Sequence, residues 1–280
     1  MKIAVTGASG FVGRHVLDVL RTRGVEVVAV TRNISNLANT DPSIKIVEMD
    51  ISRPGADYFK CLGFPDVLIH LAWGGLPNYK SLHHFETELP CQYQFLKSMV
   101  ENGLPSLLVT GTCFEYGMQS GPLCENMHAL PNNPYGLAKN ALCRQLQLLK
   151  ATRPFNLTWA RLFYMHGDGQ AASSLYPELQ EAARRGDEKF NMSGGEQLRD
   201  YLPVTEVADY LVQLALINQD IGIVNVCSGE PISVRRLVEQ WCATHGWSIS
   251  LNLGYYPYPD YEPMAFWGCR SQLNTLLNQQ

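Results

Sequence analysis

The sequence has no excess of positive charge and no long apolar run. Lysine and arginine number 22 against 26 aspartates and glutamates, which gives the 280-residue chain a formal net charge of −4 at pH 7. Proteins that bind nucleic acid through its phosphates are usually basic, so we expect no nucleic-acid partner. A membrane-spanning helix needs roughly 20 predominantly apolar residues in a row. No stretch of the sequence is that apolar, and we expect no membrane partner.

Closely spaced cysteines are also missing. The eight cysteines are scattered along the chain without a C-x-x-C pair. No basic segment precedes an apolar run at the start of the sequence, because an apolar strand pattern already begins at residue 2. These features favour a cytoplasmic protein with reduced thiols and no metal site.

Glycines recur at every third position between a short apolar strand and a helical pattern. Gly7, Gly10 and Gly13 follow the strand Ile3–Thr6, and Val25–Val30 has the pattern of the second strand of a βαβ unit. In such a turn the backbone N–H groups and the helix N-terminus bind an anion. The spacing therefore predicts a site for the pyrophosphate of a dinucleotide. Three further residues of the turn are expected to contact this cofactor, namely Ser9, Phe11 and Val12.

Apolar runs typical of buried strands alternate with helical patterns along the chain. This alternation predicts an α/β fold with a doubly wound, Rossmann-like parallel sheet. We expect residues 1–164 to form the cofactor-binding domain, with 203–229 returning to it, and 165–280 to form mainly a smaller substrate-binding domain. The predicted strands are Ile3–Thr6, Val25–Val30, Ile44–Glu48, Val67–Leu71, Ser106–Thr110, Leu157–Leu162 and Gly222–Val226. The predicted helices are Arg14–Arg23, Glu86–Glu101, Pro134–Ala151 and Leu175–Arg185.

No acidic residue follows the second strand, where an acid would hold the ribose 2′-hydroxyl of NAD. Thr31 and Arg32 occupy this place. Thr31 can form a hydrogen bond, and a guanidinium such as that of Arg32 suits a 2′-phosphate. The sequence therefore favours NADP(H) over NAD(H) as cofactor, with an ordinary surface arginine as the alternative interpretation.

Further cofactor contacts are expected where the third and fourth strands end, since ligands bind at the carboxyl ends of parallel strands. Asp50 and Ile51 follow the third strand, and Asp50 either accepts from the adenine amino group or is an ordinary loop carboxylate. Leu71 and Ala72 follow the fourth strand, and the small Ala72 leaves room for the cofactor. His70 is expected to be a buried structural histidine, because nothing in the sequence gives it a catalytic partner.

Tyr135 and Lys139 are one helical turn apart and therefore share a helix face. A lysine ammonium near a tyrosine favours the phenolate and suits the tyrosine to general acid–base catalysis. Asn133 and Pro134 before them form a good helix start. A hydroxyl close to the end of the fifth strand is supplied by Thr112.

Six segments together resemble the extended short-chain dehydrogenase/reductases that modify nucleotide sugars, the NAD-dependent epimerase/dehydratase family. The segments are Thr6–Gly13, His70–Ala72, Thr112–Gly117, Asn133–Lys139, Arg161–Phe163 and Arg199–Val204. The resemblance implies that Thr112, Tyr135 and Lys139 form the catalytic triad and that Arg199 binds the diphosphate of a nucleotide sugar. It also implies a homodimer paired through the helices Glu86–Glu101 and Pro134–Ala151. The residues expected to contact the substrate are Trp73, Cys113, Glu115, Tyr164 and Arg199, with Tyr164 standing at the family's usual asparagine.

Departures from the family pattern narrow the expected reaction. Dehydratases of this family carry an Asp-Glu pair directly after the threonine, whereas this chain has Cys113 and Phe114. The missing carboxylates argue against dehydration. Thr31 and Arg32 argue for a dissociable NADPH, and the short chain and the segment Gly111–Gly117 resemble dTDP- or CDP-linked 4-ketoreductases. The resemblance therefore implies NADPH-dependent reduction of a nucleotide-linked 4-keto-6-deoxyhexose, as in deoxysugar and O-antigen biosynthesis. The alternative is an NAD-dependent 4-epimerase. Two lesser alternatives are an epimerase-reductase resembling GDP-fucose synthase, with Cys113 and His166 as acid and base, and a non-catalytic NADP-binding sensor.

The stretch Tyr255–Pro263 is rich in tyrosine and proline. It occupies the region where relatives often place a second arginine on the diphosphate, and no arginine appears here before Arg270. Its tyrosines either contact a nucleobase or sugar, since their rings stack and their hydroxyls form hydrogen bonds, or belong to a proline-stiffened surface loop.

Overall fold

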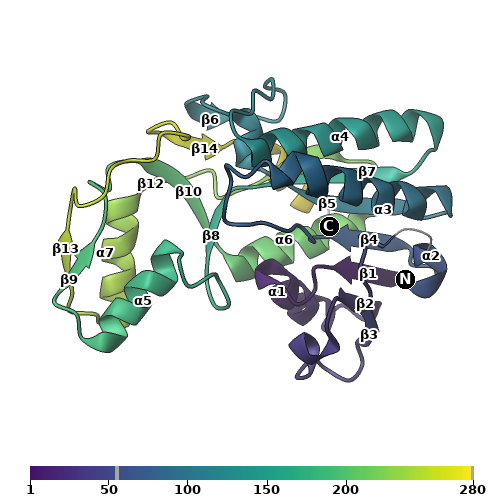
Figure 1. Ribbon diagram of the computed structural model, residues 1–280, viewed down its shortest axis with the longest axis horizontal. Helices are drawn as coiled ribbons and strands as arrows, with labels where there is room; N and C mark the ends of the chain where they lie inside the picture. Colours follow the sequence, from purple (N-terminus) through teal and green to yellow (C-terminus); the bar gives the residue numbers. More distant parts are fainter. Residues whose placement is uncertain (54–56, 279–280) are drawn as a thin grey trace.

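A seven-stranded parallel sheet forms the centre of the computed structural model, which describes residues 1–53 and 57–278 (Figure 1). The strand order is β11-β7-β5-β4-β1-β2-β3. The strands are β1 (Lys2–Thr6), β2 (Glu26–Thr31), β3 (Lys45–Glu48), β4 (Val67–His70), β5 (Ser106–Thr112), β7 (Asn156–Leu162) and β11 (Gly222–Val226). All seven are strands that the sequence predicts, and the predicted Rossmann-like α/β fold is confirmed.

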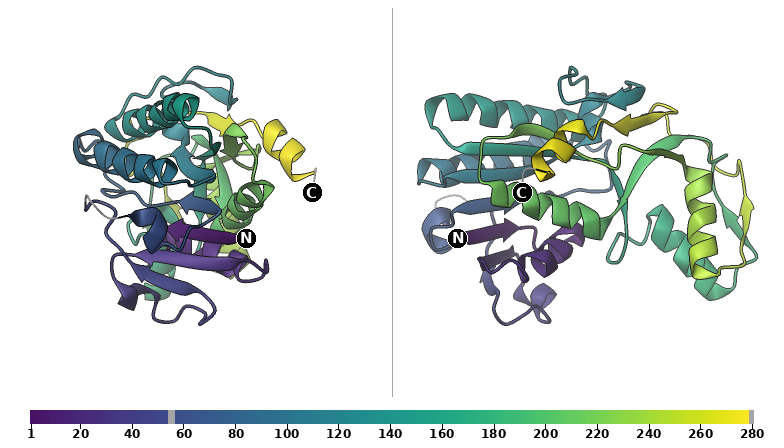
Figure 2. Two further views of the ribbon diagram at one scale, coloured as in Figure 1. Left: turned by 90° about the vertical axis from the view of Figure 1, so that its right-hand side faces the viewer. Right: turned by 180° about the vertical axis from the view of Figure 1, so that it is seen from behind.

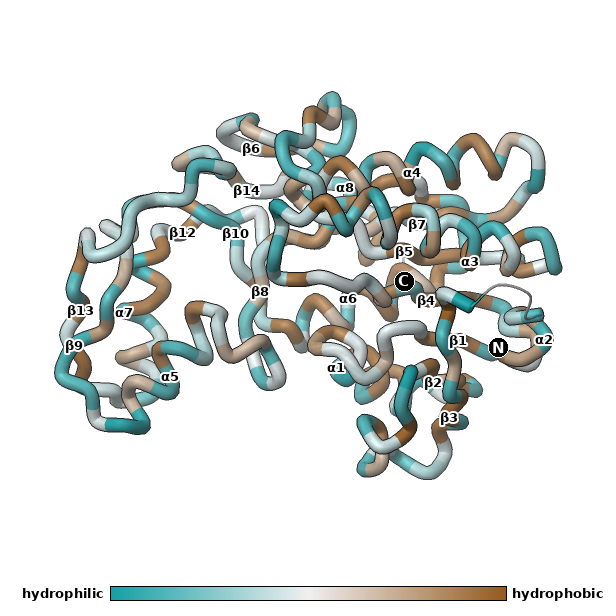
Figure 3. The backbone as a smooth tube through the Cα atoms, viewed as in Figure 1, coloured by the Kyte–Doolittle hydropathy of each residue, from teal (hydrophilic) through white to brown (hydrophobic). Residues whose placement is uncertain are grey.

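Helices cover both faces of this sheet, which explains why its strands are apolar throughout (Figure 2). One face packs against α1 (Phe11–Leu20), α6 (Val204–Ile217) and α8 (Ser271–Leu277). The other face packs against α2 (Tyr58–Cys61), α3 (Leu89–Glu101) and α4 (Pro134–Thr152). Hydrophobic residues are concentrated along the central strands and on the adjoining helices (Figure 3). Short helical turns are η1 (Ile34–Leu37), η2 (His84–Glu88) and η3 (Cys113–Tyr116).

A smaller lobe lies beyond the carboxyl ends of the strands (Figure 1). Its core includes Leu179, Phe190, Val238 and Trp241. It contains α5 (Leu175–Arg185), α7 (Val234–His245), the sheet β12-β10-β8 and the strand pair β13-β9. The strands are β8 (Tyr164–His166), β9 (Lys189–Asn191), β10 (Leu198–Pro203), β12 (Pro231–Ser233) and β13 (Ser250–Asn252).

The chain returns from this lobe to the large sheet. After β10 it forms α6, which packs beside α1, and then β11 at the edge of the sheet. Near its C-terminus β14 (Phe266–Gly268) pairs with β6 (Gly121–Leu123), and α8 then lies near β11, where Gln272 Nε2 donates to Ile223 O at 3.0 Å. The sequence did not predict α6, α7 or α8.

A disulfide joins Cys124 to Cys269, directly after the paired strands β6 and β14. The expectation of reduced thiols is therefore wrong for these two residues. They are 145 residues apart in the sequence, and only the pairing of β6 with β14 brings them together. The other six cysteines are free. In residues 1–53 and 57–278, no helix is both long enough and apolar enough to cross a membrane.

Candidate active site

At Gly7 and Gly13, the turn between β1 and α1 has no room for a side chain. Gly7 has a φ of +71°, and a Cβ there would lie 2.8 Å from the backbone nitrogen of Ala72 at the end of β4. A Cβ on Gly13 would overlap the carbonyl oxygen of Gly7, so the helix packs directly on the turn. Gly10 is the N-cap of α1. A cradle of bare backbone at a helix N-terminus fits the pyrophosphate of a dinucleotide. The other predicted contacts of the turn, Ser9, Phe11 and Val12, flank Gly10 in the chain.

Most polar groups near the ends of β2 and β3 are engaged within the protein. The buried hydroxyl of Thr31 lies 3.2 Å from that of Ser9 and donates to the carbonyl oxygen of Asn33 at 3.0 Å. The Asp50 carboxylate accepts from the backbone and hydroxyl of Ser52, which lower its pKa, with a smaller contribution from Arg53 and Arg32. Asp50 therefore matches the loop-carboxylate alternative. Arg32 is exposed, and Ile51 packs at the edge of the core on the α3 side of the sheet.

His70 is a buried structural histidine, as the sequence predicts. Its ring nitrogens lie 2.7 Å from the Thr6 hydroxyl and 2.8 Å from the Gln92 amide oxygen. Burial lowers its pKa to about 3, so the ring is neutral. Leu71 and Ala72 continue from it, and both lie against Gly7.

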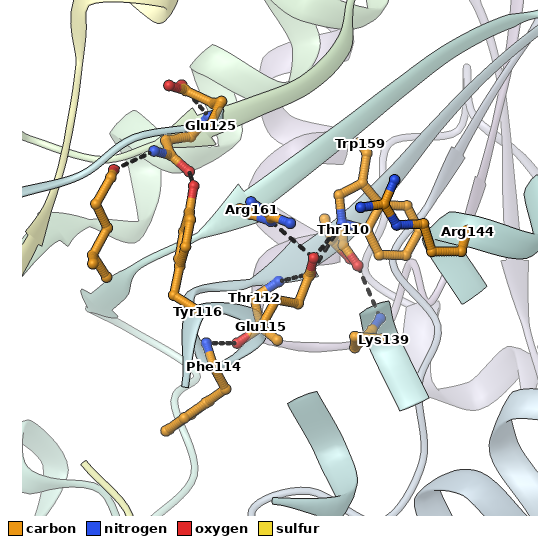
Figure 4. Close-up of polar contacts among 12 residues, drawn as sticks. Thr110, Thr112, Phe114, Glu115, Tyr116, Glu125, Lys139, Arg144, Trp159 and Arg161 are labelled. Carbon is orange, nitrogen blue, oxygen red and sulfur yellow. Dashed lines mark hydrogen bonds and ion pairs between the residues drawn. The ribbon is translucent and has the colours of Figure 1, made fainter. Parts of the chain in front are cut away.

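Thr112, Tyr135 and Lys139 come together where β5 ends against the start of α4. Asn133 caps α4 by accepting from the Gly136 N–H at 2.9 Å. A Cβ on Gly136 would lie 2.5 Å from the carbonyl oxygen of Phe114, so α4 packs directly against the turn that follows Thr112. The side chain of Thr112 lies near the Tyr135 phenol and lowers its pKa. Nζ of Lys139 donates to the carbonyl oxygen of Thr110 at 2.9 Å, as Figure 4 shows.

Burial controls the ionisation of this triad. It raises the pKa of Tyr135 far above the usual value, an effect that the nearby Thr112 side chain opposes. Burial also lowers the pKa of Lys139 to about 7, against the charges of Glu115 and Glu88. The triad thus lies in a largely dry site, where charges that develop during a reaction interact strongly with fixed groups.

An aromatic wall surrounds Tyr135. The ring centroids of Trp73, Tyr79, His84 and Phe114 lie between 5.2 and 6.3 Å from that of Tyr135. Trp73, a predicted substrate contact, also covers Nζ of Lys139 at 4.0 Å from its ring centroid. The sequence analysis missed Tyr79 and His84, although the aromatic and histidine content of the segment after β4 was a usable signal.

The stretch Tyr255–Pro263 reaches this wall with one of its tyrosines. The Tyr261 ring lies 6.3 Å from that of Tyr79 and 6.2 Å from that of Phe114. Tyr255, Tyr256 and Tyr258 are exposed. The exposed tyrosines match the surface-loop interpretation, whereas Tyr261 packs against rings of the aromatic wall.

Arg199 is buried beside the site and paired with Glu262 from the same stretch. Its Nε and Nη2 donate to Glu262 Oε2 at 3.0 and 2.7 Å, and its Nη1 donates to two carbonyl oxygens. The Tyr164 ring lies 6.0 Å from the Arg199 guanidinium, and its buried hydroxyl has no hydrogen-bond partner among the described residues. The structure thus brings together Arg199 and Tyr164, two predicted substrate contacts, and Arg199 is already paired with Glu262.

The structure separates Cys113 from His166. Cys113 is buried next to Thr112, and burial raises the pKa of its thiol well above the usual value. The His166 ring packs on Tyr176 and Trp241 in the smaller lobe. The Cys113 thiol and the His166 ring thus have different neighbours.

Glu115, predicted to contact the substrate, is instead fully buried. Its carboxylate accepts hydrogen bonds from the Thr112 N–H and the Trp159 indole and forms an ion pair with Arg161, at 2.9, 2.9 and 2.8 Å (Figure 4). The expectation is corrected, because the carboxylate has no exposed surface and is bonded to the backbone of Thr112. In the described part of the chain, no cluster of three or more His, Cys, Asp or Glu residues could hold a metal ion.

The chain is similar to known proteins over most of its length. The model of the NAD dependent epimerase/dehydratase family matches residues 3–227. The chain is 31% identical to a dTDP-6-deoxy-L-talose 4-dehydrogenase (NAD(+)) from Aggregatibacter actinomycetemcomitans, over 96% of this chain and 100% of the relative. It is 26% identical to a UDP-glucose 4-epimerase from Corynebacterium glutamicum, over 85% of this chain and 79% of the relative. Among solved structures, a UDP-N-acetylglucosamine 4-epimerase from Methanobrevibacter ruminantium M1 superposes with a TM-score of 0.87 at 23% identity, over 98% of this chain and 91% of that one.

Proposed function

The chain belongs to the NAD-dependent epimerase/dehydratase family, and we propose that it transfers a hydride between carbon 4 of a nucleotide-linked sugar and NAD. The observation that carries this proposal is the meeting of Thr112, Tyr135 and Lys139 at the carboxyl end of the sheet that bears the glycine turn. Hydride transfer at a sugar carbon needs a bound dinucleotide and a proton-transfer group beside it, and this arrangement offers a place for both.

The proposed chemistry follows from the groups present. Tyr135 takes the proton from the 4-hydroxyl of the sugar, and the Thr112 hydroxyl holds the same oxygen. The Lys139 ammonium favours the phenolate of Tyr135 once the site is filled. Bound at the glycine turn, NAD supplies the acceptor for the hydride that leaves carbon 4.

NAD replaces NADP in this proposal. The dTDP-6-deoxy-L-talose 4-dehydrogenase, which matches this chain over its whole length, is named for NAD(+). The preference for NADP that the sequence suggests through Arg32 therefore has no support. Arg32 is exposed on the surface, which matches the alternative that the sequence left open.

Two reactions share the proposed first step. A 4-dehydrogenase releases the 4-keto sugar, whereas a 4-epimerase returns the hydride to the opposite face of the ring. The relatives are named as 4-dehydrogenases and 4-epimerases, which favours the 4-epimerase alternative over the predicted 4-ketoreductase. Reduction of a 4-keto sugar is the reverse of the dehydrogenase step, and nothing in these names singles out that direction.

The test is incubation of the purified protein with NAD and a panel of dTDP-, UDP- and GDP-linked hexoses and 6-deoxyhexoses. We expect one member of the panel to react at carbon 4. Accumulation of reduced nicotinamide together with a 4-keto sugar identifies a 4-dehydrogenase. Inversion at carbon 4, detected by NMR without net reduction of NAD, identifies a 4-epimerase. The absence of both reactions across the panel, in a protein that binds NAD, would contradict the proposal.

The predicted homodimer stays a proposal. Leu137 and Leu148 of α4 are exposed, at 46% and 72% of their full surface, which is consistent with a helix pairing there. Sedimentation of the protein at several concentrations tests it.

A further inference from the structure

We propose that Glu115 is a positioning residue that fixes Thr112 and sets the charge around Tyr135 and Lys139. This inference rests on the proposed hydride transfer at carbon 4. It concerns a carboxylate with no exposed surface, so Glu115 acts through its neighbours without touching the sugar or the cofactor.

The strands beside Glu115 are built to receive a carboxylate. In the register of β5 and β7, Gly111 pairs with Arg161, and Trp159 lies two residues earlier on the same face of β7. Nε of Arg161 and Nε1 of Trp159 both donate to Glu115, as Figure 4 shows. A Cβ on Gly111 would overlap both the carboxylate of Glu115 and the indole nitrogen of Trp159. Gly111 therefore leaves the space in which Thr112, Trp159 and Arg161 bind the carboxylate of Glu115.

Glu115 determines where the Thr112 hydroxyl lies. The carboxylate accepts from the Thr112 N–H at 2.9 Å, and the Thr112 Oγ1 accepts from the Phe114 N–H at 3.3 Å. These two bonds form a capping box at the start of η3. With its backbone and its oxygen both held, Thr112 presents its hydroxyl to Tyr135.

The charge of Glu115 also acts on both ionisable members of the triad. It raises the pKa of Lys139, together with Glu88 of η2, and it raises the pKa of Tyr135. A protonated Lys139 is favoured, and the phenolate of Tyr135 is disfavoured. Other ionisable groups face Tyr135 and Lys139 from the surrounding elements. They are His70, Tyr79, His84, Cys113 and Arg161. Among these, Arg161 is the cation bound directly to Glu115, at 2.8 Å.

Two variants that each break the same ion pair provide the test. Glu115→Gln removes the negative charge, and both limbs of the pH profile of kcat should move to lower pH. Arg161→Gln leaves the carboxylate unopposed, and the profile should move to higher pH. Both variants should lose thermal stability. A structural defect alone would therefore lower kcat equally in the two variants and would not shift their pH profiles in opposite directions. For Glu115→Gln we also expect kcat to fall by about 10- to 100-fold, because a misplaced Thr112 holds the reacting oxygen poorly, with KM nearly unchanged.

Glu125→Gln is the matched control. Glu125 also accepts from a backbone N–H, that of Asn225 at 2.9 Å, and it lies in the adjoining hydrogen-bond network (Figure 4). Its loss should leave the pH profile in place. A shift in this control equal to that of Glu115→Gln would overturn the inference, as would shifts of the same direction in Glu115→Gln and Arg161→Gln.

A second measurement needs no substrate. The ammonium of Lys139 is titrated by NMR against Lys139→Met in each background, and it should lose its proton at lower pH in Glu115→Gln than in the unmodified protein, because Glu115 raises the pKa of Lys139. An unchanged titration overturns the inference even if turnover falls. Conversely, if no sugar nucleotide reacts but Lys139 titrates as expected, the proposed function fails and the inference about Glu115 stands.

Discussion

Arg199 and Glu262 form a buried ion pair, with 2.7 Å between Nη2 of the arginine and Oε2 of the glutamate. The guanidinium is thus already neutralised in the protein without a ligand. A diphosphate that binds Arg199 must share it with Glu262 or take its place, so the affinity for a sugar nucleotide contains the cost of loosening this pair.

Replacement of Arg199 by glutamine should weaken binding of dTDP or UDP by about 10- to 100-fold, because a guanidinium meets phosphate through two parallel hydrogen bonds. Isothermal titration calorimetry with the nucleoside diphosphates measures this. The control is Arg235→Gln, which breaks an exposed pair with Glu239 on α7 and should leave the affinity unchanged. Equal affinities for all three proteins would remove Arg199 from the substrate site.

Tyr135→Phe should lower turnover by about 100- to 10,000-fold, the usual contribution of a general acid–base group. The variant removes only the hydroxyl that Thr112 contacts, so the fold and the affinity for NAD should persist. Steady-state kinetics and a fluorescence titration with NAD separate the two effects. Turnover close to that of the unmodified protein would exclude Tyr135 as the proton-transfer group.

Lys139 makes the stability of the ligand-free protein depend on pH. Its folded-state pKa of about 7 lies below the ordinary lysine value of 10.5, so the unfolded chain binds more protons between these two pH values. Stability therefore rises with pH across that window, by an amount on the order of a few kcal/mol, and the cost of the buried ammonium is complete below pH 7. Lys139→Met removes this cost. Urea unfolding at pH 6 and pH 9.5 should show a large advantage of the variant at the lower pH and a smaller one at the higher. An advantage independent of pH would show that folding does not lower the pKa of Lys139.

Arg32→Gln tests the choice of cofactor. With an exposed arginine at the end of β2 and NAD as the proposed cofactor, the variant should change the dissociation constant for NAD by less than about 2-fold, as surface substitutions do. Parallel titrations with NAD and NADP make the comparison. Tighter binding of NADP than of NAD, lost in the variant, would restore the original prediction from the sequence.

Gly136→Ala should destabilise the protein, although alanine favours a helix by about 1 kcal/mol over glycine. The new Cβ would lie 2.5 Å from the Phe114 carbonyl, and overpacking of this kind costs about 1–3 kcal/mol. Because the contact seats α4 against the turn after Thr112, kcat should fall as well. Thermal unfolding and kinetics measure both effects, and a gain in stability would show that α4 does not pack so closely there.

The sequence predicts the central sheet well because its strands are buried on both faces and therefore read as apolar runs. The pair Tyr135 and Lys139 is predictable for a related reason, since helix geometry alone places them on one face. The role of Glu115 was not predictable, because it depends on the register that sets Arg161 beside Gly111. The Cys124–Cys269 bond and the pairing of Arg199 with Glu262 likewise join segments far apart in the chain. Local periodicity contains no signal for such contacts.

The course of the chain between the two lobes limits how this protein can be divided. A fragment that stops at residue 164 lacks β11 and α6, so it would expose the edge of β7 and the apolar face of α1 that α6 covers. An open strand edge beside an uncovered apolar face promotes aggregation. The half that bears the glycine turn is therefore not a transferable module. Recombination or truncation has to retain α6 and β11 or exchange the chain as a whole.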